Sequence, residues 1–127
     1  MMNHPSSDIL LIDDSASVRE VLRLALESDG YGVLEAANGR EGVRLYREHR
    51  PALVLVDMIM PEKDGIETVM EILAFDPAAV IFTMSGAGEN YQEMAIMLGA
   101  RRGFDKPVQI DGLLGAIRLT LPRRSDG

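Results

Sequence analysis

Residues that could carry out chemistry occur at four places in this chain, each at the end of a predicted strand. They are two adjacent aspartates, a third aspartate, a serine and a lysine: Asp13, Asp14, Asp57, Ser85 and Lys106. Carboxylates that share one cleft repel one another and raise one another's pKa unless a cation lies between them. Oxygen ligands without His or Cys favour a hard cation, and Mg²⁺ characteristically takes one or two carboxylates, several waters and a phosphate oxygen. If these side chains converge, we expect a Mg²⁺ site, with Mn²⁺ as the alternative ion.

A metal site of this kind suits phosphoryl transfer, in which positioning and charge neutralisation carry most of the catalysis. A carboxylate can itself be the nucleophile and form an aspartyl phosphate. In such a reaction Lys106 could pair with the phosphoryl oxygens, and Ser85 could donate a hydrogen bond to one of them.

Most of these residues also have an ordinary structural explanation. Asp13 and Asp14 could simply cap the helix that follows them, because Asp is preferred at that position. Ser85 could be a common turn serine, and Lys106 could be a surface lysine. Asp57 lacks this explanation, because it ends a run of four apolar residues and Pro61 follows four residues later.

The segments that must position these residues alternate between apolar runs and helical periodicity. Apolar runs predict strands over residues 9–12, 32–37, 53–56 and 80–84, with a weak, short strand over 103–105. Apolar residues spaced i, i+3, i+4 and i+7 predict helices over residues 15–28 and 39–49 and around 66–73, 91–98 and 110–121. The second strand is less apolar than the first, which favours a position nearer an edge of the sheet.

The periodic apolar residues of the helices are expected to face the core. In the first helix these residues are Val18, Val21, Leu22, Ala25 and Leu26. Methionines are likewise expected to fill the core rather than to form a binding surface, namely Met58, Met60, Met70, Met94 and Met97.

Alternating strands and helices predict a parallel sheet with helices on both faces. We expect an α/β fold of five βα units, doubly wound and flavodoxin-like, with five parallel strands in the order 2-1-3-4-5. In that order strands 1, 3, 4 and 5 are neighbours, so the polar residues after them meet at the edge where open α/β sheets form their sites. The chain is expected to be a single domain over residues 1–127, with its core at about 8–121.

Composition and charge exclude several other classes of function. The net charge is −7, from 20 acidic and 13 basic side chains, which argues against non-specific binding of nucleic acid. Without cysteine the chain has no disulfide, no thiolate nucleophile and no cysteine zinc site. No apolar run approaches the roughly 20 residues of a membrane span, and the N-terminus has no apolar signal core. We therefore expect a cytoplasmic protein without a nucleic-acid or membrane partner.

Taken in order, the motifs resemble a known family, the receiver domain of two-component response regulators, of which the chemotaxis regulator is the simplest member. The resemblance runs from about residue 8 to residue 121. It is carried by Leu11-Ile12-Asp13-Asp14, Asp57-Met58-Ile59-Met60-Pro61, Asp64-Gly65, Met84-Ser85-Gly86, Gly99-Ala100 and Lys106-Pro107. Each fragment is weak alone, but all of them together, in this order at strand ends, are highly specific.

The resemblance implies a role for each of the site residues. Asp57 is the expected phosphoacceptor. Asp14 and Asp57 would bind Mg²⁺ directly, and Asp13 would act mainly through water. The backbone carbonyl of Ile59 would complete the protein ligands.

The implied function is that of a regulatory phosphoacceptor, which catalyses only its own phosphorylation and dephosphorylation and is not a classical enzyme. Ser85 corresponds to the family's switch hydroxyl, and Lys106 to its site lysine, which precedes an expected cis bond to Pro107. A sensor histidine kinase or a histidine phosphotransfer protein would donate the phosphoryl group. The phosphorylated form would then rearrange the face made by the fourth helix, the fifth strand and the fifth helix for a downstream protein target.

Two features depart from the family pattern. The position three residues before Lys106 is usually Tyr or Phe, but here it is Gly103, with Phe104 beside it. The loop after Ser85 consists of small residues with high conformational freedom. These departures predict that the signal leaves the site through ordering of residues 85–88 or, failing that, through Phe104.

Three other functions share part of the pattern. A flavin mononucleotide carrier on the same fold would need a Ser-, Thr- or Gly-rich phosphate loop where Asp13 and Asp14 stand. A phosphatase of the haloacid dehalogenase type would need an acid two residues after its nucleophile, where Ile59 stands. The remaining alternative is a receiver-like interaction module that acts independently of phosphorylation, which Gly103 leaves open.

Overall fold

The elements of the chain follow the predicted alternation. In the computed structural model, which describes residues 8–60, 65–86 and 91–121, five strands alternate with five helices. The strands are β1 (Ile9–Ile12), β2 (Val33–Ala36), β3 (Leu53–Asp57), β4 (Ile81–Ser85) and β5 (Arg102–Asp105). The helices are α1 (Ala16–Ser28), α2 (Gly39–His49), α3 (Gly65–Phe75), α4 (Tyr91–Leu98) and α5 (Ile110–Thr120).

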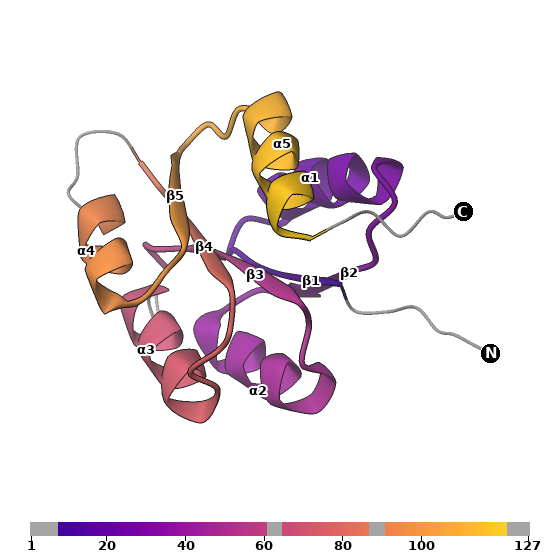
Figure 1. Cartoon of the computed structure of the whole chain (residues 1–127). Coiled ribbons are helices and arrows are strands. Elements are labelled where there is room, and N and C mark those ends of the chain that lie inside the picture. Colours follow the sequence, from indigo (N-terminus) through magenta and orange to yellow (C-terminus); the bar gives the residue numbers. More distant parts are fainter. Residues whose placement is uncertain (1–7, 61–64, 87–90, 122–127) are drawn as a thin grey trace.

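The strands form one parallel sheet in the order β2-β1-β3-β4-β5, which confirms the predicted topology (Figure 1). All residues of β1 and β3 are buried, as expected of uninterrupted apolar runs in a sheet covered on both faces. β2 lies at an edge and is mostly half-buried, in line with its lower apolar content. The register sets Ile12 opposite Val56, and Asp57 opposite Met84. The carboxyl ends of β1, β3 and β4 therefore lie level at one edge of the sheet.

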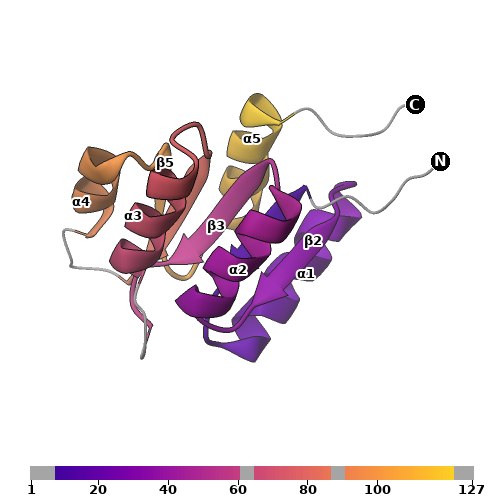
Figure 2. The same cartoon turned by 90° about the horizontal axis from the view of Figure 1, so that it is seen from below.

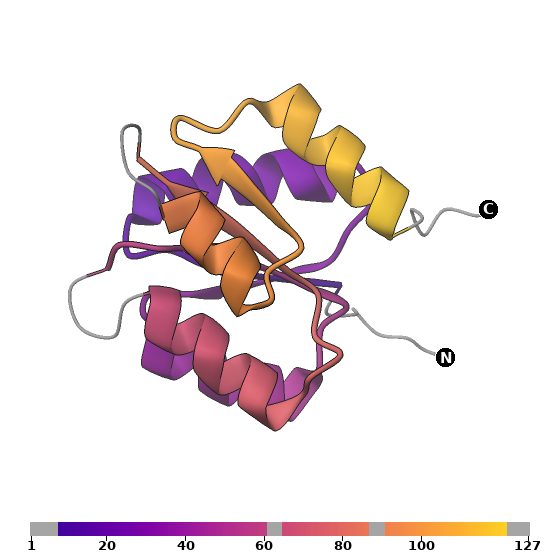
Figure 3. The ribbon, with the colours of Figure 1, turned by 60° about the vertical axis from the view of Figure 1, so that its left-hand side comes forward.

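Helices cover both faces of the sheet. α1 and α5 lie side by side on one face, and α2 and α3 lie side by side on the other (Figure 1, Figure 2). α4 packs beside β5 and α3 (Figure 3). Each layer encloses an apolar core, one between the sheet and α2, α3 and α4, and the other between the sheet and α1 and α5. Across the described ranges, none of the helices has the length and apolar character needed to cross a membrane.

The starts of two helices follow from local hydrogen bonds. The Oγ of Ser15 accepts a hydrogen bond from the N–H of Val18 at 3.2 Å and so caps α1. The side-chain oxygen of Asn38 accepts a hydrogen bond from the N–H of Glu41 at 2.8 Å, and Glu41 reaches back to the N–H of Ala37 at 3.1 Å. Both helices follow directly on strands, so these caps also set where the chain turns away from the sheet.

The core is narrower than the apolar periodicity predicts. In α1, Leu22 and Leu26 are buried, but Val21 is exposed. Met58 and Met60 are buried as predicted, whereas the prediction is wrong for the three methionines on helices, which are exposed: Met70, Met94 and Met97. On α1, α3 and α4 the predicted apolar stripe is wider than the strip that neighbouring elements cover, and periodicity alone cannot set that width.

Candidate functional site

The three predicted aspartates lie together at the carboxyl edge of the sheet. One carboxylate oxygen from each of Asp13, Asp14 and Asp57 lies within 4.8 Å of the others. Asp13 and Asp57 are buried, whereas Asp14 is exposed. The cluster therefore combines two carboxylates shielded from water with one that faces it.

Asp13 is fixed by the turn between β1 and α1. Its backbone N–H donates a hydrogen bond to the carbonyl of Ala36 on β2 at 3.1 Å. Its Oδ1 accepts a hydrogen bond from the N–H of Ser15 at 2.9 Å. Helix capping does not explain the aspartate pair, because Ser15 is the residue whose side chain caps α1.

Asp57 occupies the last position of β3. The next residue, Met58, donates its N–H to the carbonyl of Met84 at 2.8 Å, which holds the chain beyond Asp57 against β4. The Oδ1 of Asp57 accepts a hydrogen bond from the N–H of Ile59 at 3.2 Å. Burial raises the pKa of Asp57 above its ordinary value; the hydrogen bond from Ile59 opposes the rise, and the charge of Asp13 adds to it. The ionised carboxylate would therefore gain from a nearby cation.

Lys106 supplies a positive charge to the same cluster. Its Nζ lies 2.9 Å from Oδ2 of Asp13 and 3.2 Å from Oδ2 of Asp57. Its backbone N–H donates a hydrogen bond to the carbonyl of Ser85 at 2.8 Å, and the Lys106–Pro107 bond is cis, as the resemblance implied. Burial alone would lower the pKa of Lys106, but the hydrogen bonds and charges of the two aspartates raise it overall. The ammonium therefore stays charged between carboxylates that would otherwise repel each other.

Ser85 places a hydroxyl at the end of β4. Because Met84 lies opposite Asp57, Ser85 stands one position farther along the neighbouring strand. Its side chain is buried, and its Oγ has no hydrogen-bond partner in the described part of the chain. A buried hydroxyl without a partner is costly and requires an explanation. An oxygen of a bound phosphoryl group would supply the partner.

The charge of the cluster fits a divalent cation. Among the described residues, the three carboxylates and the ammonium of Lys106 give the cluster a net charge of −2. The side-chain atoms in the cluster that could bind a metal are all carboxylate oxygens, which favour a hard ion. The residues at this edge of the sheet can therefore hold a metal such as Mg²⁺.

Gly65, the first residue of α3, lies directly against the turn that follows β3. Its N–H donates a hydrogen bond to the carbonyl of Met58 at 3.0 Å. A Cβ at position 65 would clash with the carbonyl oxygen of Asp57 and the Cα of Met58. Backbone atoms cannot rotate away as a side chain can, so a side chain at this position would displace the turn that carries Asp57.

We expect Gly65→Ala to lower the free energy of unfolding by about 1–3 kcal/mol, the usual range for overpacked sites. It should also weaken binding of a divalent cation, because the turn after β3 must move. Gly115→Ala is the matched control, since a Cβ at that position of α5 meets nothing within 4 Å and alanine favours helix. Chemical denaturation and cation titration of both variants measure the effect. Equal stability of the two variants would show that residue 65 does not lie in close contact with the backbone of Asp57 and Met58.

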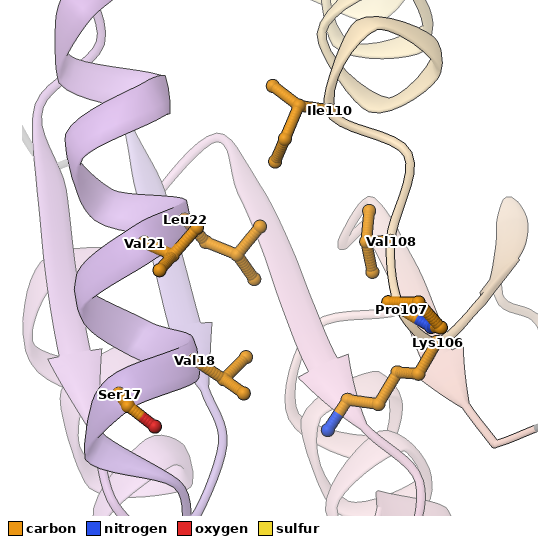
Figure 4. A pocket seen from close by; sticks show the side chains of 8 residues that line it. All are labelled: Ser17, Val18, Val21, Leu22, Lys106, Pro107, Val108 and Ile110. Atoms are coloured by element: carbon orange, nitrogen blue, oxygen red, sulfur yellow. The ribbon is translucent and has the colours of Figure 1, made fainter.

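An apolar groove opens beside the carboxylate cluster, between α1 and the segment that follows β5 (Figure 4). Its volume is about 530 Å³, and it is lined by Ser17, Val18, Val21, Leu22, Lys106, Pro107, Val108 and Ile110. Figure 4 shows the side chain of Lys106 extending from this segment toward the α1 side of the groove. Sequence patterning gives no sign of the groove, because it places Val21 in the core.

Gly103 and Phe104 lie on opposite faces of β5. Phe104 packs into the core that α1 and α5 cover, with its ring centroid 5.6 Å from that of Phe82. Gly103 lies opposite Thr83 and faces the other side of the sheet. Phe104 therefore does not take the place of the missing aromatic side chain. Of the loop predicted to order, residues 87 and 88 lie outside the described residues.

Comparison with known proteins relates the chain to one family. The family model for the response regulator receiver domain matches residues 9–118 of this sequence. The chemotaxis protein CheY of Bacillus subtilis (strain 168) is 41% identical over 115 residues, which cover 89% of this chain and 96% of that protein.

Solved structures show the same similarity. A response regulator receiver domain protein from Clostridium thermocellum has a TM-score of 0.86 and 30% identity, covering 91% of this chain and 94% of that chain. A chain of the CheX-CheY-BeF3-Mg complex from Borrelia burgdorferi has a TM-score of 0.83 and 27% identity, covering 89% of this chain and 87% of that chain. The similarity thus extends over most of each chain.

Proposed function

The chain belongs to the response regulator receiver domain family, and from this membership we propose that it is a phosphoacceptor signalling domain. In this proposal Asp57 accepts a phosphoryl group in a reaction that depends on Mg²⁺, and the face formed by α4, β5 and α5 then changes for a downstream protein target. The observation that carries the proposal is the convergence of three carboxylates, the ammonium of Lys106 and the unpartnered hydroxyl of Ser85 at one edge of the sheet.

The phosphodonor would be a phosphohistidine on a sensor histidine kinase or on a histidine phosphotransfer protein. A carboxylate oxygen of Asp57 attacks the phosphorus, so that a P–O bond forms and the P–N bond breaks. The electron pair of the broken bond leaves with the imidazole, which takes up a proton. With acetyl phosphate as donor, the same attack would release acetate. In this proposal the domain takes part only in its own phosphorylation and dephosphorylation and is not a classical enzyme.

Mg²⁺ is the ion that we assign to the carboxylates, because its charge of +2 balances the net charge of the three carboxylates and Lys106 taken together, and because it prefers oxygen ligands. Asp14 and Asp57 would bind it directly, Asp13 would act through water, and the carbonyl of Ile59 would complete the protein ligands. When bound, the ion neutralises charge on the oxygens of the transferred group. Mn²⁺ is the alternative ion.

Lys106 and Ser85 would hold the transferred group. The Nζ of Lys106 already contacts Oδ2 of Asp57 at 3.2 Å, so it can pair with phosphoryl oxygens after a small movement. Ser85 would donate its buried hydroxyl to another of these oxygens. Charge-assisted hydrogen bonds are roughly twice as strong as neutral ones, so both contacts favour the phosphorylated state.

The phosphodonor protein must cover the rim that carries Lys106, because its phosphorus has to come within bonding distance of Asp57. The apolar groove lies next to this edge of the sheet, because the side chain of Lys106 also lines the groove. We therefore place the phosphodonor protein on this groove, with Val21 at the contact.

Val21→Asp is expected to slow phosphotransfer from a sensor kinase that phosphorylates the wild type by at least roughly tenfold, because the partner would bury an unpaired charge. Phosphorylation by acetyl phosphate should be unchanged, since a small donor needs no groove. Met70→Asp on α3 is the matched control, because the two side chains are similarly exposed, at 59% for Val21 and 53% for Met70. If both variants accept the phosphoryl group from the kinase at the same rate, the groove is not the docking site.

For the output, α4 offers an exposed apolar surface that includes Met94 and Met97. α4 packs beside β5, where Gly103 has no side chain to move. We therefore expect phosphorylation to act on α4 through the end of β4, where Ser85 lies, and not through an aromatic ring on β5.

Amide hydrogen exchange measures this route. When the protein is phosphorylated or binds beryllofluoride with Mg²⁺, exchange should slow more at Gly86 and in α4 than at residues 103–105, because pinning Ser85 restricts the segment that follows it. For residues 87–90, outside the described part of the chain, the expectation rests on the sequence alone. A larger change at residues 103–105 would show that the signal leaves through β5.

Small phosphodonors separate this proposal from its alternative. With acetyl phosphate and Mg²⁺, the intact mass should rise by one phosphoryl group, and hydroxylamine should remove it; with EDTA no gain is expected. The alternative is an interaction module that acts independently of phosphorylation, which the replacement of the family's aromatic residue by Gly103 leaves open. It predicts no gain in mass with or without Mg²⁺.

A further inference from the structure

Arg19 joins α1 to the turn that carries two of the clustered aspartates. Its Nη1 donates a hydrogen bond to the backbone carbonyl of Asp13 at 2.7 Å. Its Nε donates to Oε1 of Glu35 on β2 at 3.0 Å. From these contacts we infer that Arg19 is a positioning residue for the proposed Mg²⁺ site, because it fixes the peptide group between Asp13 and Asp14.

The backbone of Asp13 is held from both sides. Its N–H donates to the carbonyl of Ala36 at 3.1 Å, and its carbonyl accepts from Arg19. A trans peptide group is planar, so the guanidinium that fixes the direction of the Asp13 carbonyl also fixes the N–H of Asp14 and the path of the chain to its Cα. The side chain of Asp14 is exposed, so packing contributes little to its position. The place of its carboxylate therefore depends on this peptide group.

Glu35 orients Arg19 toward the turn. Its Oε1 pairs with Nε of Arg19 at 3.0 Å, and its Oε2 pairs with Nε of Arg23 at 2.9 Å. Two guanidiniums thus share one carboxylate, and the side chain of Arg19 is only 17% exposed. Arg23 pairs with Glu35 and with Glu27, and it offers a control that has the same charge and one of the same partners.

The sign of the effect distinguishes positioning from charge. A guanidinium near a cation site repels the cation, so the loss of its charge alone would leave Mg²⁺ binding unchanged or tighter. Loss of a positioning contact would instead weaken binding, because Asp14 would no longer be held beside Asp57. Removal of Arg19 should therefore weaken Mg²⁺ binding, although it removes a positive charge. Removal of Arg23 should leave Mg²⁺ binding unchanged or make it tighter.

This inference rests on the proposed function, because it concerns the same Mg²⁺ site. Isothermal titration calorimetry with MgCl₂ on the unphosphorylated protein compares the wild type with Arg19→Ala, Arg19→Lys and Arg23→Ala. We expect Arg19→Ala to bind Mg²⁺ roughly tenfold more weakly, the lower end of the range for residues that orient metal ligands. Arg23→Ala should bind it as tightly as the wild type or more tightly. Arg19→Lys should be intermediate, because an ammonium lacks the forked donors that reach the carbonyl and Glu35 together.

A metal-free measurement accompanies the titration. In EDTA, the backbone amide NMR signal of Asp14 should shift in Arg19→Ala and stay in place in Arg23→Ala. If Arg19→Ala binds Mg²⁺ as tightly as Arg23→Ala, the inference is overturned and the proposed function is left intact. If Arg19→Ala does not fold, Arg19→Lys decides, and wild-type affinity in that variant overturns the inference. If the wild type shows no saturable Mg²⁺ binding, the proposed function fails and the inference fails with it.

Discussion

Asp57→Asn is expected to abolish phosphorylation of this chain. The substitution removes the nucleophilic carboxylate but keeps the shape of the side chain, whose oxygen can still accept the hydrogen bond from the N–H of Ile59. With acetyl phosphate and Mg²⁺, intact-mass spectrometry should find one added phosphoryl group on the wild type and none on the variant. An added group that persists in Asp57→Asn would assign the acceptor to another residue.

The same variant should be at least as stable as the wild type when no metal is bound. The pKa of Asp57 is raised, chiefly by burial, which means that folding disfavours the ionised carboxylate. A carboxyl group with a raised folded-state pKa lowers stability at pH values above that pKa, and the loss disappears as the pH falls through it. In EDTA near neutral pH the unfolding temperature of Asp57→Asn should therefore match or exceed that of the wild type, and the difference should shrink in acid. A clearly lower unfolding temperature would show that the charge of Asp57 stabilises the metal-free fold.

Lys106→Ala should destabilise the metal-free protein and blunt its response to phosphorylation. Without the ammonium, the buried carboxylates of Asp13 and Asp57 lose a counter-charge that lies 2.9 and 3.2 Å away. Removing one partner of a fully buried ion pair costs about 3–5 kcal/mol. Because the Lys106 side chain is 26% exposed, we expect a smaller loss of about 2 kcal/mol in EDTA. Denaturation curves with and without Mg²⁺ should show that the ion restores part of this stability.

The chemical effect of Lys106 can be separated from its packing. Lys106→Met keeps an unbranched stem along the groove (Figure 4) and removes only the charge. Both variants should still bind Mg²⁺, but they should be phosphorylated slowly and should lose the exchange response in α4, because no cation pairs with the phosphoryl oxygens. A Lys106→Met protein with the wild-type response would assign the role of this residue to packing.

Much of the fold could be predicted because each element carries a local signal. The uninterrupted apolar runs of β1 and β3 match strands that are buried on both faces. The convergence of Asp13 and Asp57 could be predicted too, because the carboxyl ends of neighbouring parallel strands meet at one edge. The alternation of strands and helices limits the order of such strands to few choices.

Other features depend on how the elements pack, which no local pattern encodes. Val21 belongs to the apolar stripe of α1, yet it is exposed, because the segment after β5 leaves a groove beside it. The pairing of Arg19 with Glu35 joins residues 16 positions apart on a helix and an edge strand. Charged residues are common on helices, so the sequence does not show which of them turns toward the site.

The position of the phosphoryl group can be determined chemically. Borohydride reduces an acyl phosphate of aspartate to homoserine, and peptide mass spectrometry then identifies the converted residue. After treatment of the wild type with acetyl phosphate, we predict conversion at Asp57 when Mg²⁺ is present and no conversion in EDTA. Conversion at Asp13, Asp14 or another residue, or equal conversion at Asp57 without the metal, would contradict a Mg²⁺-dependent phosphoacceptor at Asp57.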